Sequence, residues 1–134
     1  MLILDTNVLS AVRRPDRAPQ VATWLAAQEE DALRLSVLTL GEIERGIALQ
    51  ASRNPTFAAD LRDWIDRTVL MFGDRLLAFD ARDARIWGAL SARIGHAGVD
   101  LMIAAQALAR DAVVVTFNGS DFTPTGARIL EPSA

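Results

Sequence analysis

The sequence predicts an α/β fold with a central, mostly parallel sheet flanked by helices. Short apolar runs alternate along the chain with longer stretches whose apolar residues recur at helical spacing, and this alternation is typical of parallel sheets with helical crossovers. With 134 residues, 51% of them hydrophobic, the chain is long enough to bury a core. No internal repeat or linker interrupts the pattern, so we expect a single domain over residues 1–134.

The N-terminal half should contain two strands and four helices. The apolar run Leu2–Leu4 is typical of a short buried strand, and the helix after it should end near Pro15. Two of the later helices in this half begin with proline, at Pro19 and Pro55, because proline favours the first helical position. Spacing places Leu49 and Leu70 on inward helix faces. The remaining elements of this half are a helix from Pro19 to about Gln28, a strand at 33–37, a helix that Thr39 opens, and a helix over 55–72.

The C-terminal half should contain three strands and two helices. Gln106 is the only polar residue between positions 101 and 109, so the helix there should be buried on nearly all sides. Asp80 is a good cap for the helix before it, and Gly95 ends that helix. The elements in order are a strand at 76–79, a helix over 80–94, a helix over 100–109, a strand at 113–115, a turn at 118–121 and a strand at 128–130.

Composition excludes several classes of site. The absence of cysteine excludes disulfides, thiolate metal sites and cysteine nucleophiles. All fourteen lysine-or-arginine positions hold arginine, which excludes a Walker A phosphate loop and a Schiff base. The net charge of −3 argues against a large basic surface for nucleic acid. The sequence shows neither a basic leader nor an apolar run of about 20 residues. We therefore expect a cytoplasmic protein without membrane contact.

Four acidic residues fall at the predicted strand ends and helix starts. Asp5 follows the first strand, Glu42 lies in the first turn of a helix, Asp100 begins the most apolar helix, and Asp121 follows the valine-rich strand. Ligands of parallel sheets bind at the carboxyl ends of the strands, so we expect these four acids to meet there. Each has a simpler explanation taken singly. Asp5 and Asp100 could be helix N-caps, Glu42 could complete a capping box with Thr39, and Asp121 could be an exposed loop acid.

Carboxylates that meet in one pocket favour a divalent cation. They repel one another unless a positive charge lies between them. Ligation by oxygen alone, with no cysteine and one histidine, favours Mg²⁺ or Mn²⁺ over zinc. A water bound to such an ion is a usable nucleophile, and the ion offsets the charge that builds on a phosphodiester. The pattern therefore predicts metal-assisted hydrolysis of phosphodiester bonds.

Four motifs in this order resemble those of the PIN-domain nucleases, and more narrowly the VapC- and FitB-type toxins of bacterial toxin–antitoxin pairs. The resemblance spans nearly the whole chain and implies the three-layer PIN fold. A lone Asp-Thr-Asn would be weak evidence, but four ordered motifs at plausible spacings are strong. The motifs are Leu4-Asp5-Thr6-Asn7-Val8, the stretch from Leu38 through Glu42 to Gly46, the stretch from Asp100 to Ala107, and Thr116-Phe117-Asn118-Gly119-Ser120-Asp121-Phe122.

The resemblance implies residue roles, an activity and partners. Asp5, Glu42 and Asp100 would be the principal metal-binding acids, with Asp121 as a more loosely placed fourth. Supporting roles fall to Asn7, Thr116 and Thr6. The implied activity is Mg²⁺- or Mn²⁺-dependent cleavage of RNA as the toxin of a pair, inhibited by a cognate antitoxin whose C-terminal segment occupies the groove. The resemblance also implies a homodimer.

Several features leave alternatives open. Arg13, Arg14, Arg45 and Asn118 are candidates for substrate contact, although solvated or structural roles explain the arginines as well. Phe117 stands where many relatives carry arginine, and the loop before Asp100 is shorter than is common. Two other functions fit the same residues. One is a nuclease of the same fold that acts on DNA or on RNA-processing intermediates, and the other is a binding module that keeps the acids without catalysis.

Overall fold

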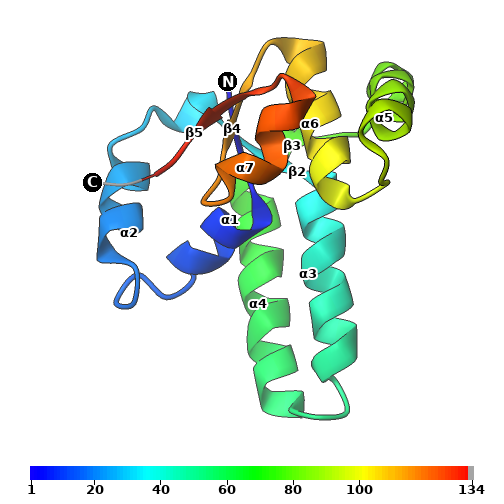
Figure 1. Ribbon diagram of the computed structural model, residues 1–134. Coiled ribbons are helices and arrows are strands. Elements are labelled where there is room, and N and C mark those ends of the chain that lie inside the picture. The colour runs from blue at the N-terminus through cyan, green and yellow to red at the C-terminus, as the bar shows by residue number, and fades with distance from the viewer. Residues whose placement is uncertain (133–134) are drawn as a thin grey trace.

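A computed structural model describes residues 1–132 and shows a five-stranded, wholly parallel sheet within them (Figure 1). Ser133 and Ala134, which the predicted domain includes, lie outside the described residues. The strand order is β3-β2-β1-β4-β5, so the N-terminal strand lies at the centre. The strands are β1 (Leu2–Leu4), β2 (Leu33–Ser36), β3 (Leu76–Leu77), β4 (Val113–Val115) and β5 (Arg128–Leu130).

The strand register brings the carboxyl ends of the three central strands together. Leu4, the last residue of β1, pairs with Leu35 of β2 and with Val115 of β4. The residues that follow these positions, Asp5 and Thr116 among them, therefore leave the sheet at one edge. This is the arrangement that the sequence predicted for the first acid.

Helices cover the sheet, and two of them form an arm that extends away from it. We call the antiparallel pair α3 and α4 the arm (Figure 1). None of the helices in residues 1–132 combines the length and apolar content that crossing a membrane requires. The helices are α1 (Thr6–Val12), α2 (Pro19–Ala26), α3 (Val37–Gln50), α4 (Pro55–Phe72), α5 (Ala81–Ile94), α6 (Val99–Arg110) and α7 (Gly119–Phe122), with short 3-10 turns at Glu30–Ala32, Gly73–Arg75 and Thr123–Thr125.

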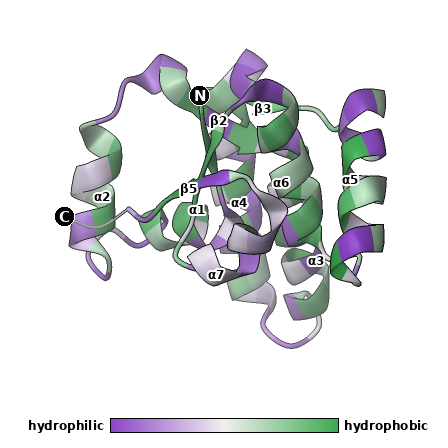
Figure 2. Ribbon diagram, turned by 45° about the horizontal axis from the view of Figure 1, so that its top comes forward, coloured by the Kyte–Doolittle hydropathy of each residue, from purple (hydrophilic) through white to green (hydrophobic). Residues whose placement is uncertain are grey.

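The apolar core lies on both faces of the sheet, which confirms the three layers. Successive strand residues point to opposite faces. Leu4 and Val115 are fully buried in a cluster with residues of α1 to α4. Ile3 and Val114 are fully buried in a second cluster with residues of α5 to α7. Figure 2 shows α6 largely in hydrophobic colours, whereas hydrophilic and hydrophobic segments alternate along α5.

The helix that carries Glu42 begins earlier than predicted. Ser36 is the N-cap of α3, and its hydroxyl accepts the backbone N–H of Leu38 at 3.1 Å. Thr39 lies inside the helix and is fully buried. The prediction that Thr39 opens this helix is therefore wrong, and so is a capping box between Thr39 and Glu42. Because β2 ends at Ser36, the strand passes into α3 without a loop that hydrophobic spacing could reveal.

Four other local predictions are also corrected. Gly98 is the N-cap of α6, so Asp100 lies in the first turn of the helix and is not its cap. The strand predicted at 76–79 ends at residue 77, and the predicted turn at 118–121 contains the short helix α7. Leu49 and Leu70 are 52% and 82% exposed, so both point outward. Their helices carry apolar residues on more than one side, so the spacing alone did not show which side faces the core.

Candidate active site

Asp5 is held at the carboxyl end of the central strand by hydrogen bonds to both of its carboxylate oxygens. It follows β1 directly and is only 5% exposed. Oδ1 accepts the backbone N–H of Thr6 at 2.9 Å and so caps α1. Oδ2 accepts the hydroxyl of Thr116 at 2.9 Å, and Thr116 is itself buried just after β4. Asp5 is therefore a helix cap as well as a fixed, buried acid, so the two sequence interpretations do not exclude each other.

The environment of Asp5 disfavours its charged form. Burial raises the pKa of Asp5 above its usual value of 3.8. The hydrogen bonds from Thr116 and Thr6 lower this pKa by less, and the negative charge of Asp121 raises it again. A carboxylate with a raised pKa is one that a nearby cation would stabilise.

Glu42 reaches the same region from α3. One oxygen of its carboxylate accepts the hydroxyl of Thr6, the residue directly after Asp5. The hydroxyls of Thr6 and Thr39 lie 3.1 Å apart, and Thr39 precedes Glu42 by three residues on α3. Positions three apart share a helix face. Thr6 therefore joins the start of α1 to the face of α3 that carries Glu42.

Asp100 lies in the first turn of α6, where the charges of the other three acids act on it. Burial, above all, raises the pKa of this half-buried side chain above 3.8. The negative charges of Asp5, Asp121 and Glu42 raise the pKa further, in that order, and His96 lowers it. Repulsion from all three acids at once requires that they lie near the same carboxylate. Asp100 therefore lies within electrostatic range of the other three predicted acids.

The four acids share a neighbourhood but do not yet surround a single point. Asp121, in α7, is exposed, and its charge acts on both Asp5 and Asp100. Over residues 1–132, none of the four acids forms an ion pair with arginine. In the same part of the chain, no three acidic or histidine side chains converge closely enough to hold one ion as they stand. The structure therefore shows an uncompensated acidic region without a closed ligand set.

Other residues that the sequence singled out are exposed around this region. Asn7, Arg45 and Asn118 are exposed, and their side chains make no hydrogen bond or ion pair with residues 1–132. The guanidinium of Arg14 is also exposed, 3.9 Å from a carboxylate oxygen of Asp16. Supporting or substrate-binding roles for these four residues stay predictions.

A surface cavity of about 290 Å³ adjoins the acids between α1, α3 and α4. Thr6 and Glu42 lie at its acidic end. The guanidinium of Arg13 lies 5.2 Å from the ring centre of Phe57, which places a cation and an aromatic ring in the same wall. The remaining lining residues are Ser10, Ile43, Gly46, Leu61 and Trp64.

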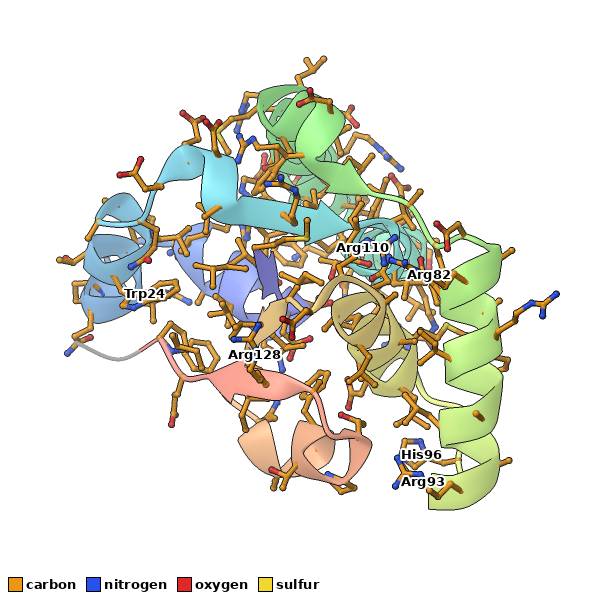
Figure 3. All side chains as sticks on the ribbon, turned by 90° about the horizontal axis from the view of Figure 1, so that it is seen from above. Trp24, Arg82, Arg93, His96, Arg110 and Arg128 are labelled. Carbon is orange, nitrogen blue, oxygen red and sulfur yellow. The ribbon has the colours of Figure 1, made fainter. Side chains whose placement is uncertain are left out.

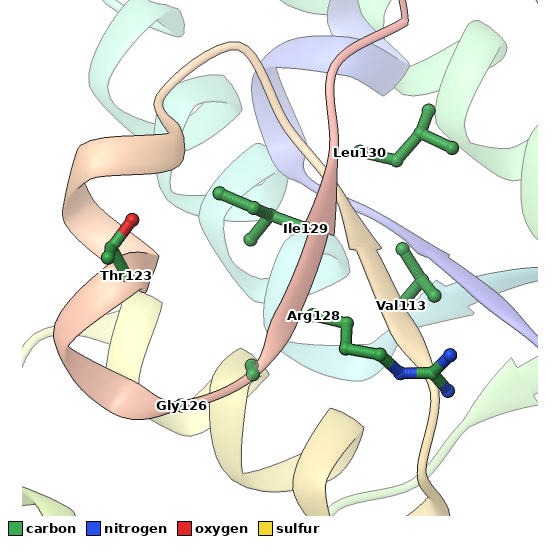
Figure 4. Close-up of a pocket in the computed structure, with 7 residues that line it drawn as sticks. Val113, Thr123, Gly126, Arg128, Ile129 and Leu130 are labelled. Atoms are coloured by element: carbon green, nitrogen blue, oxygen red, sulfur yellow. The ribbon is translucent and has the colours of Figure 1, made fainter.

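A larger cavity, of about 590 Å³, lies away from the acids. It is lined by residues of β4, β5 and the turn before β5, including Val113, Thr123 and Arg128 (Figure 4). None of the four acids lines it. Its walls are largely apolar, so the larger cavity is not the site of the acidic residues.

His96 is the only histidine of the sequence, and sequence reasoning gave it no role, but it lies within electrostatic range of Asp100. It lowers the pKa of Asp100, and its Nδ1 accepts the backbone N–H of Gly98 at 3.2 Å. The hydroxyl of Ser91 donates to the His96 carbonyl at 2.8 Å. Figure 3 shows His96 beside Arg93 at the end of α5. The sequence could not assign His96 to the site, because a single histidine in a glycine-containing loop forms no recognisable motif with other catalytic or metal-binding residues.

Comparisons with known proteins agree with this architecture. The sequence matches the PIN domain family over residues 2–125. The plasmid stability protein StbB of Pseudomonas syringae pv. tomato is 33% identical over 98% of either chain. Ribonuclease VapC14 of Mycobacterium tuberculosis is 36% identical over 74% of this chain and 90% of its own. The crystal structure of FitAcB from Neisseria gonorrhoeae has a TM-score of 0.85 at 28% identity and 98% coverage of both chains. The chain therefore belongs to the PIN domain family and, within it, to the VapC-like proteins.

Proposed function

We propose that this protein is a divalent-metal-dependent endoribonuclease that acts as the toxin of a toxin–antitoxin pair. The observation that carries the proposal is the position of Asp100, which three other acids repel, while none of these acids is paired with an arginine within residues 1–132. The repulsion within such a cluster destabilises the fold unless a positive charge compensates it. A hard cation is the usual ligand of a site whose donors are all oxygen atoms.

The donor set fits Mg²⁺ or Mn²⁺. Asp5, Glu42, Asp100 and Asp121 would hold the ion, and all their donors are carboxylate oxygens, which these cations prefer. Mg²⁺ retains several waters, so carboxylates that do not converge on one point can still hold it through water. When bound, the ion supplies a water of lowered pKa and offsets charge on the phosphodiester.

The chain's own residues orient the acids and the substrate. The hydroxyls of Thr116 and Thr6 fix the carboxylates of Asp5 and Glu42, so that little reorganisation is needed when substrate arrives. Arg13 lines the same cavity as Glu42 and can contact a phosphate there. Asn7, Arg14, Arg45 and Asn118 are exposed candidates for further contacts with the substrate.

RNA is the proposed substrate. Ribonuclease VapC14 carries that activity in its name, and the four motifs resemble those of VapC- and FitB-type toxins. Phe117, which is 37% exposed directly after Thr116, offers a ring on which an unpaired base can stack. Stacking of this kind favours single-stranded regions of RNA over a duplex.

The test of the activity compares substrates and variants. Purified protein with Mg²⁺ is incubated with single-stranded RNA, single-stranded DNA and a structured RNA precursor of matched length. Cleavage of the RNA alone is expected, and preference for DNA or the precursor would support the alternative nucleases instead. Asp5→Asn should abolish both RNA cleavage and growth inhibition on expression. A folded Asp5→Asn variant that keeps both activities would favour a non-catalytic binding module.

An antitoxin segment is the proposed occupant of the cavity between α1, α3 and α4. The cavity combines apolar walls from Ile43, Leu61 and Trp64 with the charged side chains of Arg13 and Glu42, which suits an amphipathic peptide segment. Co-expression with the antitoxin should protect cells, and Leu61→Asp should weaken that protection without abolishing cleavage. The homodimer that the resemblance implies is tested by sedimentation of the isolated protein.

A further inference from the structure

Gln106 is a fully buried polar residue in the middle of the most apolar helix. It lies on α6, and none of its surface is exposed. Its position cannot be explained by solubility, because the residues around it from 101 to 109 are all apolar. A buried amide is tolerated only when its donors and acceptor are paired.

The side-chain amide of Gln106 joins α6 to the ends of two strands. Its nitrogen donates to the carbonyl of Ala78 at 3.0 Å and to that of Leu77 at 3.3 Å. Its oxygen accepts the hydroxyl of Ser36 at 2.6 Å. Ser36 and Leu77 are the last residues of β2 and β3, and Ala78 directly follows β3. The helix is therefore fixed to the sheet edge at which the acids gather.

Ser36 carries the connection into α3. Its hydroxyl has one proton, which it donates to Gln106, and it accepts the backbone N–H of Leu38 as the N-cap of the helix. Ser36 is also fully buried, so water cannot replace either partner from the surface. One hydroxyl thus links the start of α3 to the middle of α6.

Each end of this link lies six residues from a site acid. Glu42 follows Ser36 by six residues along α3, and Asp100 precedes Gln106 by six along α6. Six helical residues span about 9 Å, and a helix transmits a shift over that length with little bending. We propose that the Ser36–Gln106 hydrogen bond sets the spacing of Glu42 and Asp100, which makes Gln106 a positioning residue of the site. This inference rests on the proposed metal-dependent activity.

Variants at both ends of the bond test the proposal. Gln106→Met keeps the length and apolar stem of the side chain and removes its hydrogen bonds. Ser36→Ala removes the hydroxyl that donates to Gln106. It is a smaller change, so it tests the same bond if Gln106→Met folds poorly. Thr68→Val is the matched control, because Thr68 is buried and its hydroxyl donates to the Trp64 carbonyl at 2.8 Å within α4. All proteins are studied well below their melting temperatures.

Binding of Mn²⁺ and cleavage of RNA are the two readouts. The Mn²⁺ dissociation constant is measured by electron paramagnetic resonance of the free ion, with no RNA present. Gln106→Met and Ser36→Ala should each weaken Mn²⁺ binding by about tenfold, as loss of groups that orient metal ligands typically does. The kcat for RNA should fall while KM changes little, since no residue proposed to contact RNA is altered. The loss of Mn²⁺ affinity in the double variant should be less than the product of the two single fold-losses, because both changes break the Ser36–Gln106 bond, although each also removes a bond of its own.

The outcomes separate this inference from the proposed function. Unchanged Mn²⁺ affinity and kcat in folded Gln106→Met and Ser36→Ala, with an active wild type, would overturn the positioning role and leave the function standing. Equal losses in Thr68→Val would also overturn it, because they would reflect stability alone. A wild type that neither binds Mn²⁺ nor cleaves RNA would overturn the proposed function and this inference with it.

Discussion

Asp100 combines partial burial with repulsion from three neighbouring acids, and both effects act against its charged form. Its raised pKa means that the ionised carboxylate is less stable in the fold than in the unfolded chain. Asp100→Asn removes the charge and nearly keeps the shape. In the absence of metal we expect the variant to unfold at a higher temperature than the wild type, while its RNA cleavage falls by more than about a hundredfold.

Thermal unfolding in EDTA, together with an RNA cleavage assay, measures both effects. Asp74→Asn is the control, because Asp74 is exposed in the turn before β3, at the amino ends of the strands and opposite the edge that carries the acids, and it should change neither quantity. A lower melting temperature for Asp100→Asn would contradict the repulsion inferred at this residue.

Thr116 shows how a neutral side chain can matter as much as an acid. Its hydroxyl donates to Asp5 at 2.9 Å in a site where both residues are buried. Thr116→Val keeps the shape and removes the bond, so cleavage should fall by about 10–100-fold. The stability cost should be only about 1 kcal/mol. Urea unfolding measures the loss of stability, and cleavage rates measure the loss of activity. Thr125→Val is the control, because it removes a buried hydrogen bond to the Phe122 carbonyl that does not involve Asp5, and it should lower stability alone.

At the scale of elements, α5 and α6 are joined by a buried ion pair. Asp83 is fully buried, and its Oδ1 accepts a hydrogen bond from Arg110 at 2.6 Å. Burial by itself raises the pKa of Asp83, but the hydrogen bonds from Arg110 and Asp80 and the charge of Arg110 lower it by more, to a net value below 3.8. The ionised pair therefore stabilises the fold above about pH 4 and loses its effect as the pH falls further.

Asp83→Asn should lower the free energy of unfolding by about 3 kcal/mol at pH 7, because it leaves the Arg110 charge without its main partner. The difference from the wild type should shrink as the pH falls from 4 towards 2. Urea unfolding at several pH values measures it, and Asp74→Asn, at an exposed position, is the control. A difference that stays constant over this range would show that the carboxylate charge has no part in the stability.

The elements themselves followed largely from local sequence. Pro19 and Pro55 begin α2 and α4 as their preference for the first helical position predicted, and Gly95 ends α5 with a positive φ of 100°. The start of α3 did not follow, because Ser36 is both the last residue of β2 and the helix cap. The outward direction of Leu70 was also missed, since it depends on where α4 meets the sheet and not on the spacing within the helix.

Over the whole molecule, the site brings together side chains separated by long stretches of sequence. Asp5 could be placed from sequence because it directly follows a buried strand. Its partner Thr116 lies 111 positions away, and the contact of Thr6 with Glu42 joins positions 36 apart. Which oxygen accepts which hydroxyl depends on the strand register and the helix docking, so the resemblance implied the supporting residues but not their bonds.

Metal loading should stabilise the whole molecule. A divalent cation bound among acids that repel one another favours the folded state, by about 2.7 kcal/mol at a concentration one hundred times its dissociation constant. We expect Mn²⁺ to raise the melting temperature of the wild type, and to raise it less in Asp5→Asn. Sodium chloride at the same ionic strength is the control. An equal rise in both proteins would mean that the cation acts elsewhere.

The arm formed by α3 and α4 carries the turn at residues 51–54 away from the sheet (Figure 1). Because the chain has no cysteine, Arg53→Cys would introduce a unique thiol at an exposed position on that turn. A fluorophore attached there would leave the carboxylates untouched. Its anisotropy would then report in real time when a protein inhibitor settles against the neighbouring helices and when it departs.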